Sequence, residues 1–309
     1  MDKTAILQKL KDITGIRGLL LPAPFHIEEN MGVVSMMMPA VEGKQPLGVT
    51  ANMQQDASAF EGWATCMKAA APGWSFCLDW TVPQNKDDGH YQRFLYRVNK
   101  FMKYYGDWFS TADDRAEDLA SAQIKEGEKY LLNAPTNTHD RVNDAKHLEE
   151  NRIENTIIKT QPHVLNELFN IQRLERQLPV GAFKEKVSKA TAIFPRGKSA
   201  VDIWGISSNN ELVIFELKAP GNMKVGVISE LFFYAMILLD EQEDKCTRDH
   251  QWGKDIRATT SLKAMVLAKE VHPLITRSVF DCLNKPFTDG RIQFGYVRTT
   301  GNNGFGKVY

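Results

Sequence analysis

The chain has 309 residues, of which 43% are hydrophobic and 25% are charged, and its 38 basic residues balance its 38 acidic residues. This length exceeds one ordinary hydrophobic core, so two domains are expected, and the composition excludes a disordered or fibrous chain. The absence of net charge excludes a protein that binds nucleic acid by bulk electrostatics, so any such site must be local.

Neither a membrane span nor a disulfide framework is indicated. The longest apolar candidate, residues 231–239, falls short of the ~20 residues that cross a bilayer. The first residues, MDKTAILQKLKDITG, mix charges of both signs and lack the apolar region of a signal peptide. Cys66, Cys77, Cys246 and Cys282 form no CxxC pair, which favours reduced thiols. We therefore expect a cytoplasmic protein with no membrane partner.

The first 140 residues have the pattern of a separate α/β domain of no recognised type. Strands are predicted at 32–39 and 74–82, a helix at 57–71, a second helix at 90–109 and a solvated helix at 111–129. The second helix has an apolar face made of Phe94, Leu95, Val98, Phe101, Met102 and Tyr105. Arg93, Arg97, Lys100 and Lys103 follow one another along the same helix. This basic stripe either contacts phosphates or is a solvated helix edge.

A polar stretch at 133–145 marks the boundary to a second domain, residues 146–309. Helices are predicted at 147–158, 163–174, 225–239 and 273–283, and strands at 199–206, 211–218, 263–268 and 291–298. The first two of these strands flank SSNN, which has the chemistry of a hairpin loop. This order predicts a mixed central sheet flanked by helices on both faces.

Three charged residues occupy positions on the hairpin that the apolar pattern marks as at least half buried. Glu216 and Lys218 share a strand face with Leu212 and Ile214, and Asp202 lies on the preceding strand. Buried charges are costly unless they are paired or bind a metal. The hairpin brings Asp202 towards Glu216, and two close carboxylates favour a hard cation such as Mg²⁺. Lys218 points into the same space, where it could orient a water molecule or stabilise a transition state.

Asp202 followed by Glu216-Leu217-Lys218 resembles the motif of the PD-(D/E)xK, or restriction-endonuclease-like, nuclease superfamily. The resemblance covers about the last 160 residues and implies an α/β core and phosphodiester hydrolysis that depends on Mg²⁺ or Mn²⁺. It implies that Asp202, Glu216 and the Leu217 carbonyl hold the metal, with Lys218 beside the attacking water. Val201 stands where many members have proline, which is a departure from the pattern.

Helices on either side of the hairpin carry accessory candidates. Glu150-x-x-Ile153-x-x-x-Ile157 fits the pattern by which members place a catalytic glutamate on the first core helix, with Glu154 as its substitute. Glu230 and Tyr234 lie where some members have Gln-x-x-x-Tyr, and the glutamate departs from that pattern. His147 precedes Glu150 and is either close to the site or simply exposed.

Other patterns have simpler interpretations. Glu216 and Lys218 could instead be a structural ion pair on a solvated strand face. A basic cluster before the Asp202 strand could lead a nucleic-acid backbone into the site or be a solvated loop. Its members are Lys184, Lys186, Lys189, Arg196 and Lys198. Gly301 to Lys307 mimics a phosphate-binding loop, but Val308 stands where Ser or Thr is needed, so a flexible tail is predicted.

The sequence therefore predicts a metal-dependent endonuclease that acts on DNA rather than RNA. A role in bacterial antiviral defence is expected by family analogy alone. The N-terminal domain is expected to recognise the substrate, a signal or an activating partner protein. A homodimer is expected, because cutting both strands often needs two active sites. The alternative is a nucleic-acid-binding or regulatory module that has the same fold but does not cut.

Overall fold

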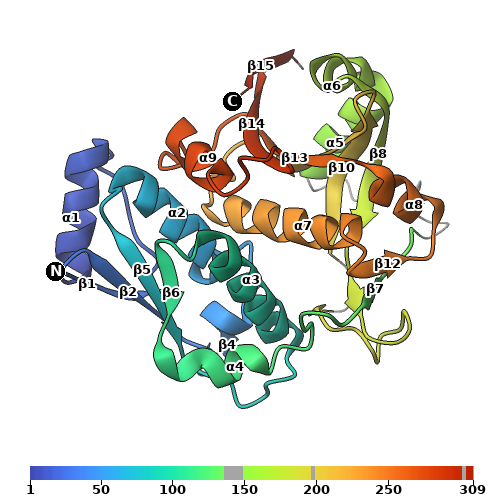
Figure 1. The fold of residues 1–309 in the computed structure, drawn as a ribbon. Coiled ribbons are helices and arrows are strands. Elements are labelled where there is room, and N and C mark those ends of the chain that lie inside the picture. The colour runs from blue at the N-terminus through green and yellow to red at the C-terminus, as the bar shows by residue number, and fades with distance from the viewer. Residues whose placement is uncertain (136–148, 196–198, 301–303, 309) are drawn as a thin grey trace. The chain divides into compact units, whose positions relative to one another are not determined.

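The computed structural model describes residues 1–135, 149–195, 199–300 and 304–308, and these group into two compact units (Figure 1). Unit 1 consists of Met1–Lys125, Lys224–Glu230 and His272–Pro286. Unit 2 consists of Glu126–Met223, Leu231–Val271 and Phe287–Tyr309. The units interleave along the chain, so unit 1 takes two short segments from the second half. The division at 1–140 and 146–309 stays a prediction about folding domains.

Unit 1 is built on a four-stranded sheet in the order β1-β2-β5-β6. Its strands are β1 (His26–Asn30), β2 (Val33–Met38), β5 (Ser75–Trp80) and β6 (Phe109–Thr111). The first pair is antiparallel, whereas β2, β5 and β6 run parallel. A two-stranded hairpin, β3 (Val41–Glu42) and β4 (Gln45–Pro46), lies outside this sheet. Parallel neighbours require crossover connections, which helices supply here.

The helices of unit 1 are α1 (Lys3–Thr14), α2 (Phe60–Ala70), α3 (Gly89–Tyr105), α4 (Ala116–Ala120) and α9 (Arg277–Asn284), with 3₁₀ turns at Gly48–Thr50, Asp56–Ser58 and Asp113–Arg115. Helix α2 connects β2 to β5, and α3 connects β5 to β6. Edge-to-face ring contacts join Phe60 on α2 to Phe94 and Phe101 on α3, at 5.6 and 5.8 Å between centroids. The predicted strands and both long helices are confirmed, but the helix predicted at 111–129 shrinks to α4.

Unit 2 contains a six-stranded mixed sheet in the order β15-β14-β13-β11-β10-β8. Its strands are β8 (Ile171–Pro179), β10 (Ala200–Ser207), β11 (Glu211–Lys218), β13 (Ser261–Ala268), β14 (Ile292–Thr300) and β15 (Gly304–Val308). Strands β11, β13 and β14 are parallel, and the remaining pairings are antiparallel. Gly205 lets β8 approach β10, because a Cβ there would lie 2.7 Å from the Arg173 carbonyl oxygen.

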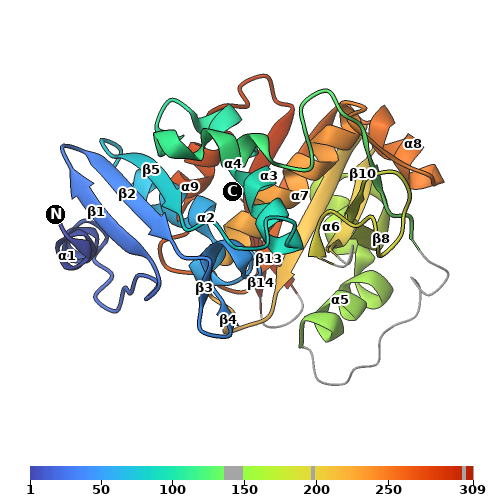
Figure 2. The ribbon, with the colours of Figure 1, turned by 90° about the horizontal axis from the view of Figure 1, so that it is seen from below.

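Helices cover both faces of this sheet, as the sequence predicts. They are α5 (Glu149–Thr160), α6 (Pro162–Phe169), α7 (Gly226–Gln242, of which Leu231 onward belongs to unit 2) and α8 (Gln251–Ala258). Helix α6 lies beside β8 (Figure 1 and Figure 2), and the α5–α6 side packs against Phe215 and Leu217. On the opposite face Trp204 meets Trp252 of α8, with ring centroids 4.8 Å apart. Charged residues on β10 and β11 therefore lie within a covered sheet.

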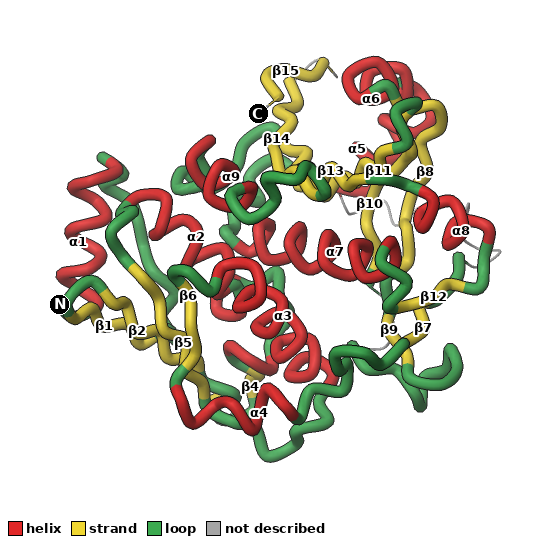
Figure 3. Tube along the Cα trace, in the orientation of Figure 1, coloured by secondary structure: helices red, strands yellow, loops and turns green. Residues whose placement is uncertain are grey.

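A separate three-stranded sheet completes unit 2 (Figure 3). Its order is β12 (Cys246–Arg248), β7 (Tyr130–Leu132) and β9 (Ala182–Phe183). The buried Arg248 forms an ion pair with Glu241 at 3.0 Å and also donates to the Asn133 carbonyl at 2.7 Å. Arg248 thereby connects β12 to α7 and to the residue that follows β7.

Two predictions about unit 2 are wrong. The helix predicted at 163–174 ends at Phe169, because Asn170 takes a left-handed conformation (φ 53°), and the chain continues as β8. Ile171, Leu174 and Leu178 are spaced like a helix face, which explains the error. The predicted flexible tail instead forms β15, which pairs with β14. Residues 301–303 of that segment lie outside the described residues.

No described helix has the length and apolar character that a bilayer crossing requires. The four cysteines are free thiols, as the sequence predicts. Burial raises the pKa of Cys282 to about 11 and holds the pKa of Cys66 still further above its ordinary value. These two thiols are therefore protonated at neutral pH.

Candidate active site

The β10–β11 hairpin sets the position of the two carboxylates that the sequence singled out. The strands pair in register from Ile206↔Leu212 to Ile203↔Phe215, and one further step in this register places Asp202 opposite Glu216. The side chains of directly opposed residues point to the same face of an antiparallel pair. The register therefore sets Asp202 and Glu216 at the same depth from the hairpin turn.

The backbone pairing of β10 with β11 ends at Ile203↔Phe215, and beyond it the Asp202 side chain bonds to the backbone of β11. Asp202 Oδ2 accepts a hydrogen bond of 2.9 Å from the Leu217 backbone N–H. On its other side, β11 stays paired with β13 as far as Lys218↔Ala268. The N–H and C=O of one strand residue point the same way, so the Leu217 carbonyl also faces β10. A carboxylate and a backbone carbonyl, both hard oxygen ligands, therefore meet where the two strands part.

Glu216 and Lys218 form an ion pair within β11. Lys218 Nζ lies 2.5 Å from Glu216 Oε1, and the lysine and the glutamate are 7% and 3% exposed. The ion pair considered as an alternative is therefore present, but the strand face is buried rather than solvated. Removing both charges from water costs several kcal/mol per ion. Such an arrangement is a poor source of stability.

Helix α5 contributes two glutamates that serve different neighbours. Glu150 Oε1 accepts hydrogen bonds from the Ala219 backbone N–H at 3.1 Å and from Asn222 Nδ2 at 3.2 Å. Glu150 thereby holds the chain that leaves β11 just beyond Lys218. Glu154 is 2% exposed and faces β8. The structure thus brings both helix candidates to the open end of the β10–β11 pair, away from its turn: Glu150 contacts the chain after β11, and Glu154 contacts β8.

Glu154 is held by two consecutive residues of β8. Arg176 Nε lies 3.0 Å from Glu154 Oε1 without the alignment of a hydrogen bond, while Arg176 also donates to Asn155 Oδ1 at 2.8 Å. Gln177 Nε2 donates to both Glu154 oxygens at 3.2 and 3.3 Å. Burial raises the pKa of the Glu154 carboxyl, and the charge of Arg176 together with these hydrogen bonds acts in the opposite direction.

Gln177 also reaches the central aspartate, and the sequence did not point to it. Its Nε2 lies 3.5 Å from Asp202 Oδ1, at the long limit of a hydrogen bond. Its φ of 52° lies in the left-handed region, which is rare for a residue inside a strand. The sequence prediction missed Gln177 because it missed strand β8. It ended a helix at Leu174 and placed Arg176 and Gln177 in no element, so neither residue was expected beside Asp202.

Asp202, Glu216 and the Leu217 carbonyl match the oxygen ligands that Mg²⁺ takes from proteins. In the described part of the chain, no three His, Cys, Asp or Glu side chains converge as a ready metal cage. Mg²⁺ rarely uses such a cage, since it retains waters and needs one or two carboxylates. The donor set therefore fits Mg²⁺, which these three groups would hold.

The accessory candidates on α7 belong to different units. Glu230 lies in unit 1, where Gln54 donates a hydrogen bond to its Oε1. Tyr234 lies in unit 2, is buried and contacts the Phe233 ring. These contacts do not link either residue to Asp202 or Glu216, so their catalytic roles stay predictions.

The prediction of an accessible basic stripe on α3 is wrong for its two arginines, because both are buried. Arg97 is 1% exposed, and its guanidinium binds both oxygens of Glu61. Arg93 is 4% exposed and contacts His90 Nδ1 at 3.1 Å. A guanidinium enclosed in this way is not presented to a phosphate, whereas Lys100 is half-buried beside the Tyr96 ring.

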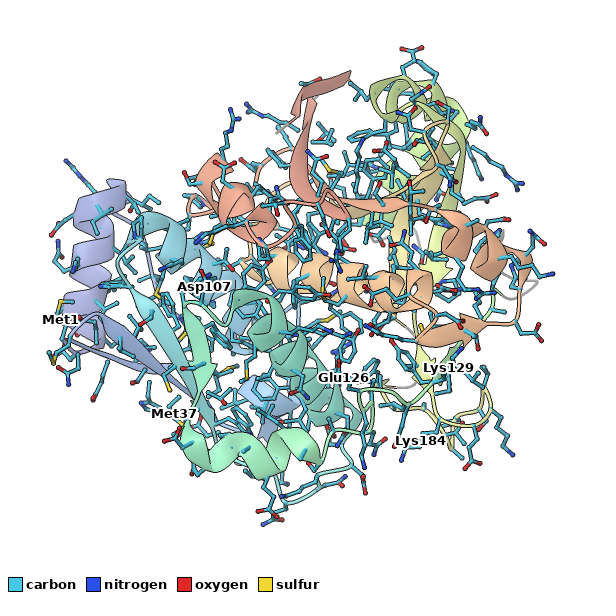
Figure 4. The ribbon with its side chains drawn as sticks, viewed as in Figure 1. Met1, Met37, Asp107, Glu126, Lys129 and Lys184 are labelled. Carbon is cyan, nitrogen blue, oxygen red and sulfur yellow. The ribbon has the colours of Figure 1, made fainter. Side chains whose placement is uncertain are left out.

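The basic cluster before Asp202 is partly described, and its described members face solvent. Lys184, Lys186 and Lys189 are exposed on the segment after β9, where Figure 4 labels Lys184. Arg196 and Lys198 lie outside the described residues, as does His147. The three lysines therefore keep the surface position that contact with a nucleic-acid backbone would need.

Comparison with known proteins yields no relative from which a role could be transferred. No family model, curated protein or solved structure matches the chain. The interpretation of the site depends on its own residues and geometry.

Proposed function

We propose that unit 2 is a nuclease domain that hydrolyses the phosphodiester bonds of DNA with Mg²⁺ or Mn²⁺. One observation carries the proposal: the Asp202 carboxylate accepts from the Leu217 N–H, between the buried Glu216 and Lys218, just beyond the last partners of β10 and β11. A mixed sheet with a helix before the hairpin and helices on both faces is compatible with a restriction-endonuclease-like core. The order Asp202, Glu216, Lys218 supports the same assignment.

The side chains have separable tasks in this proposal. Asp202, Glu216 and the Leu217 carbonyl hold the metal ion. When bound, the ion lowers the pKa of a water molecule and neutralises charge on the phosphate. Lys218 Nζ orients that water and stabilises the charge that develops on the phosphate oxygens. Glu150 keeps the chain after Lys218 in place through the Ala219 N–H.

The rest of the molecule has supporting roles in the proposal. Lys184, Lys186 and Lys189 contact the nucleic-acid backbone near the site. Unit 1 recognises the substrate, a signal or an activating protein, and two copies of the chain cut the two strands of a duplex. Action on foreign DNA in antiviral defence is proposed by analogy of fold and motif alone.

A second candidate is a nucleic-acid-binding module that does not cut. One observation favours it: Lys218 already binds Glu216 at 2.5 Å and occupies an oxygen that the metal requires. In this case DNA binding would be insensitive to chelator, and the ion pair would be purely structural.

The test is cleavage of plasmid DNA with Mg²⁺ or Mn²⁺, with single-stranded DNA and RNA run in parallel. Lys218→Ala should lower the rate by at least about 10²-fold. Lys263→Ala is the matched control, because Lys263 pairs with Glu211 at 2.8 Å at the far end of β11. Loss of cleavage in the first variant alone supports the nuclease. If no nucleic acid is cut in either metal but DNA is bound with EDTA present, the binding module replaces it.

A further inference from the structure

The strand β8 carries a residue whose backbone is held in an unfavourable conformation beside the site. Gln177 has φ 52°, although it lies inside the strand and is not glycine. For residues with a Cβ this region costs about 1–2 kcal/mol. Strained residues persist only when their surroundings impose the conformation, and they concentrate at functional sites. The strained backbone of Gln177 therefore favours a functional role for its side chain.

The pairing of β8 with β10 shows what the distortion changes. The partners Val201↔Leu178 and Ile203↔Arg176 lie on either side of the step at which Gln177 and Asp202 face each other. Gln177 Nε2 and Asp202 Oδ1 lie 3.5 Å apart at this step. At this step the amide side chain reaches across to the carboxylate.

The two oxygens of Asp202 are thus contacted from opposite strands. Leu217 N–H of β11 donates to Oδ2 at 2.9 Å, and Gln177 of β8 lies at Oδ1. Gln177 is itself anchored, because both oxygens of Glu154 accept from the same Nε2. Glu154 is 2% exposed and is neutralised by Arg176, which fixes this anchor.

We infer that Gln177 is a positioning residue that orients the Asp202 carboxylate for metal binding, with Glu154 as its anchor. The inference builds on the proposed nuclease function. Groups that orient a metal ligand without touching the metal are typically worth about 10- to 100-fold in metal affinity or activity. The same geometry assigns Glu154 a supporting role rather than a place on the metal.

The test separates positioning from structural support through two readouts on the full-length chain. Mn²⁺ is titrated calorimetrically in the absence of DNA, and the melting temperature is measured without metal. Gln177→Gly removes the amide but suits the left-handed backbone, so relief of strain offsets the missing hydrogen bonds. We expect its melting temperature to change by about 3 °C or less. We expect its Mn²⁺ affinity to fall by about 10- to 100-fold.

Asn170→Gly is the matched control. Asn170 also has a positive φ, of 53°, and its side-chain amide also donates a hydrogen bond, to the Ser208 hydroxyl at the other end of β10. This variant should change stability as little as Gln177→Gly does and should bind Mn²⁺ like the wild type. Gln177→Asn keeps tolerance for the left-handed region but has a shorter reach, so an intermediate affinity is expected.

Asp202→Ala distinguishes failure of this inference from failure of the proposed function. If Asp202→Ala abolishes Mn²⁺ binding while Gln177→Gly and Gln177→Asn bind like the wild type, Gln177 has no positioning role but the metal site stands. If the wild type binds no Mn²⁺, or Asp202→Ala binds it unchanged, both the metal site and the role of Gln177 are overturned. A selective decrease in both Gln177 variants, with Asn170→Gly unaffected, supports the inference.

Discussion

The two units both bury an ion pair, but they surround it differently. In unit 1 Arg97 binds Glu61 through Nε and Nη2, donates to the Ser58 carbonyl at 2.7 Å, and Glu61 accepts from Ser229 at 2.8 Å. In unit 2 Lys218 and Glu216 lie two residues apart on one strand, next to Asp202. The first pair joins α3 to α2 and to the start of α7. The second pair lies within β11.

This difference shows which buried charges serve the fold. A buried pair is stable when further hydrogen bonds satisfy its remaining donors and acceptors, as they do around Arg97 and Glu61. Lys218 and Glu216 lie on one strand, on either side of Leu217, whose backbone N–H donates to the Asp202 carboxylate. We propose the reaction for unit 2 because its buried pair lies beside a second carboxylate, that of Asp202.

The largest effect is expected from Arg97→Ala in unit 1. It leaves the Glu61 carboxylate buried without its cation, which typically costs about 3–5 kcal/mol of unfolding free energy. Urea unfolding followed by circular dichroism measures the decrease. Lys285→Ala provides a control, because Lys285 and Asp107 form an exposed pair in the same unit, and it should change stability by less than about 1 kcal/mol. Equal decreases in the two variants would contradict the structural role of Arg97.

In unit 2, replacing both members of the pair should have the opposite sign. Glu216→Leu with Lys218→Met removes two desolvated charges and leaves an apolar strand face, which is neutral or stabilises by about 1–4 kcal/mol. Cleavage should be abolished in this variant. The same urea titration measures the gain, and Glu61→Leu with Arg97→Met is the counterpart that should be less stable, because Ser58 and Ser229 are left without their partners. A destabilised Glu216–Lys218 double variant would mean that unit 2 also relies on its pair.

The exposed lysines after β9 in unit 2 should affect DNA binding more than the half-buried Lys100 on α3 in unit 1. Changing Lys184, Lys186 and Lys189 to Gln should weaken DNA binding and reduce the slope of log affinity against log salt by about 1 for each phosphate that is no longer neutralised. Fluorescence anisotropy at several salt concentrations measures this slope. Lys100→Gln on α3 is the comparison, and no change of slope is expected. An unchanged slope in the triple variant would exclude this segment from the nucleic-acid interface.

The smallest effect is a pH dependence located in unit 1. Burial lowers the pKa of His272, which packs against the Trp63 ring and accepts from the Leu274 N–H through Nδ1. The unfolded chain therefore takes up a proton more readily, so the stability contribution is present above pH 6.5 and is lost as the pH falls towards the folded pKa. His272→Asn keeps an acceptor that does not titrate. Its melting temperature should fall by about 2 °C less than that of the wild type between about pH 7.5 and 5.5. Parallel curves would rule out His272 as the titrating group.

Much of the local structure followed from periodicity. Glu211–Lys218 was predicted to the residue, because an apolar run after SSNN can only return along the preceding strand. The long helix α3 was found from its apolar face. The equal depth of Asp202 and Glu216 followed from counting back from SSNN, because both residues lie on the strands that this loop joins.

The sequence alone determined which charges are unusual: Asp202, Glu216 and Lys218 stand out because their neighbours are apolar, and that contrast is local. Only the tertiary structure decided that Arg97 is enclosed by Glu61, which lies 36 residues away. It also decided that 171–179 forms a strand at the edge of the sheet, since Ile171, Leu174 and Leu178 suit either a helix or a strand until β10 provides the partner. No sequence pattern therefore indicated a role for Gln177. Its role depends on a left-handed backbone and on two carboxylates from other elements, and no local pattern records either one.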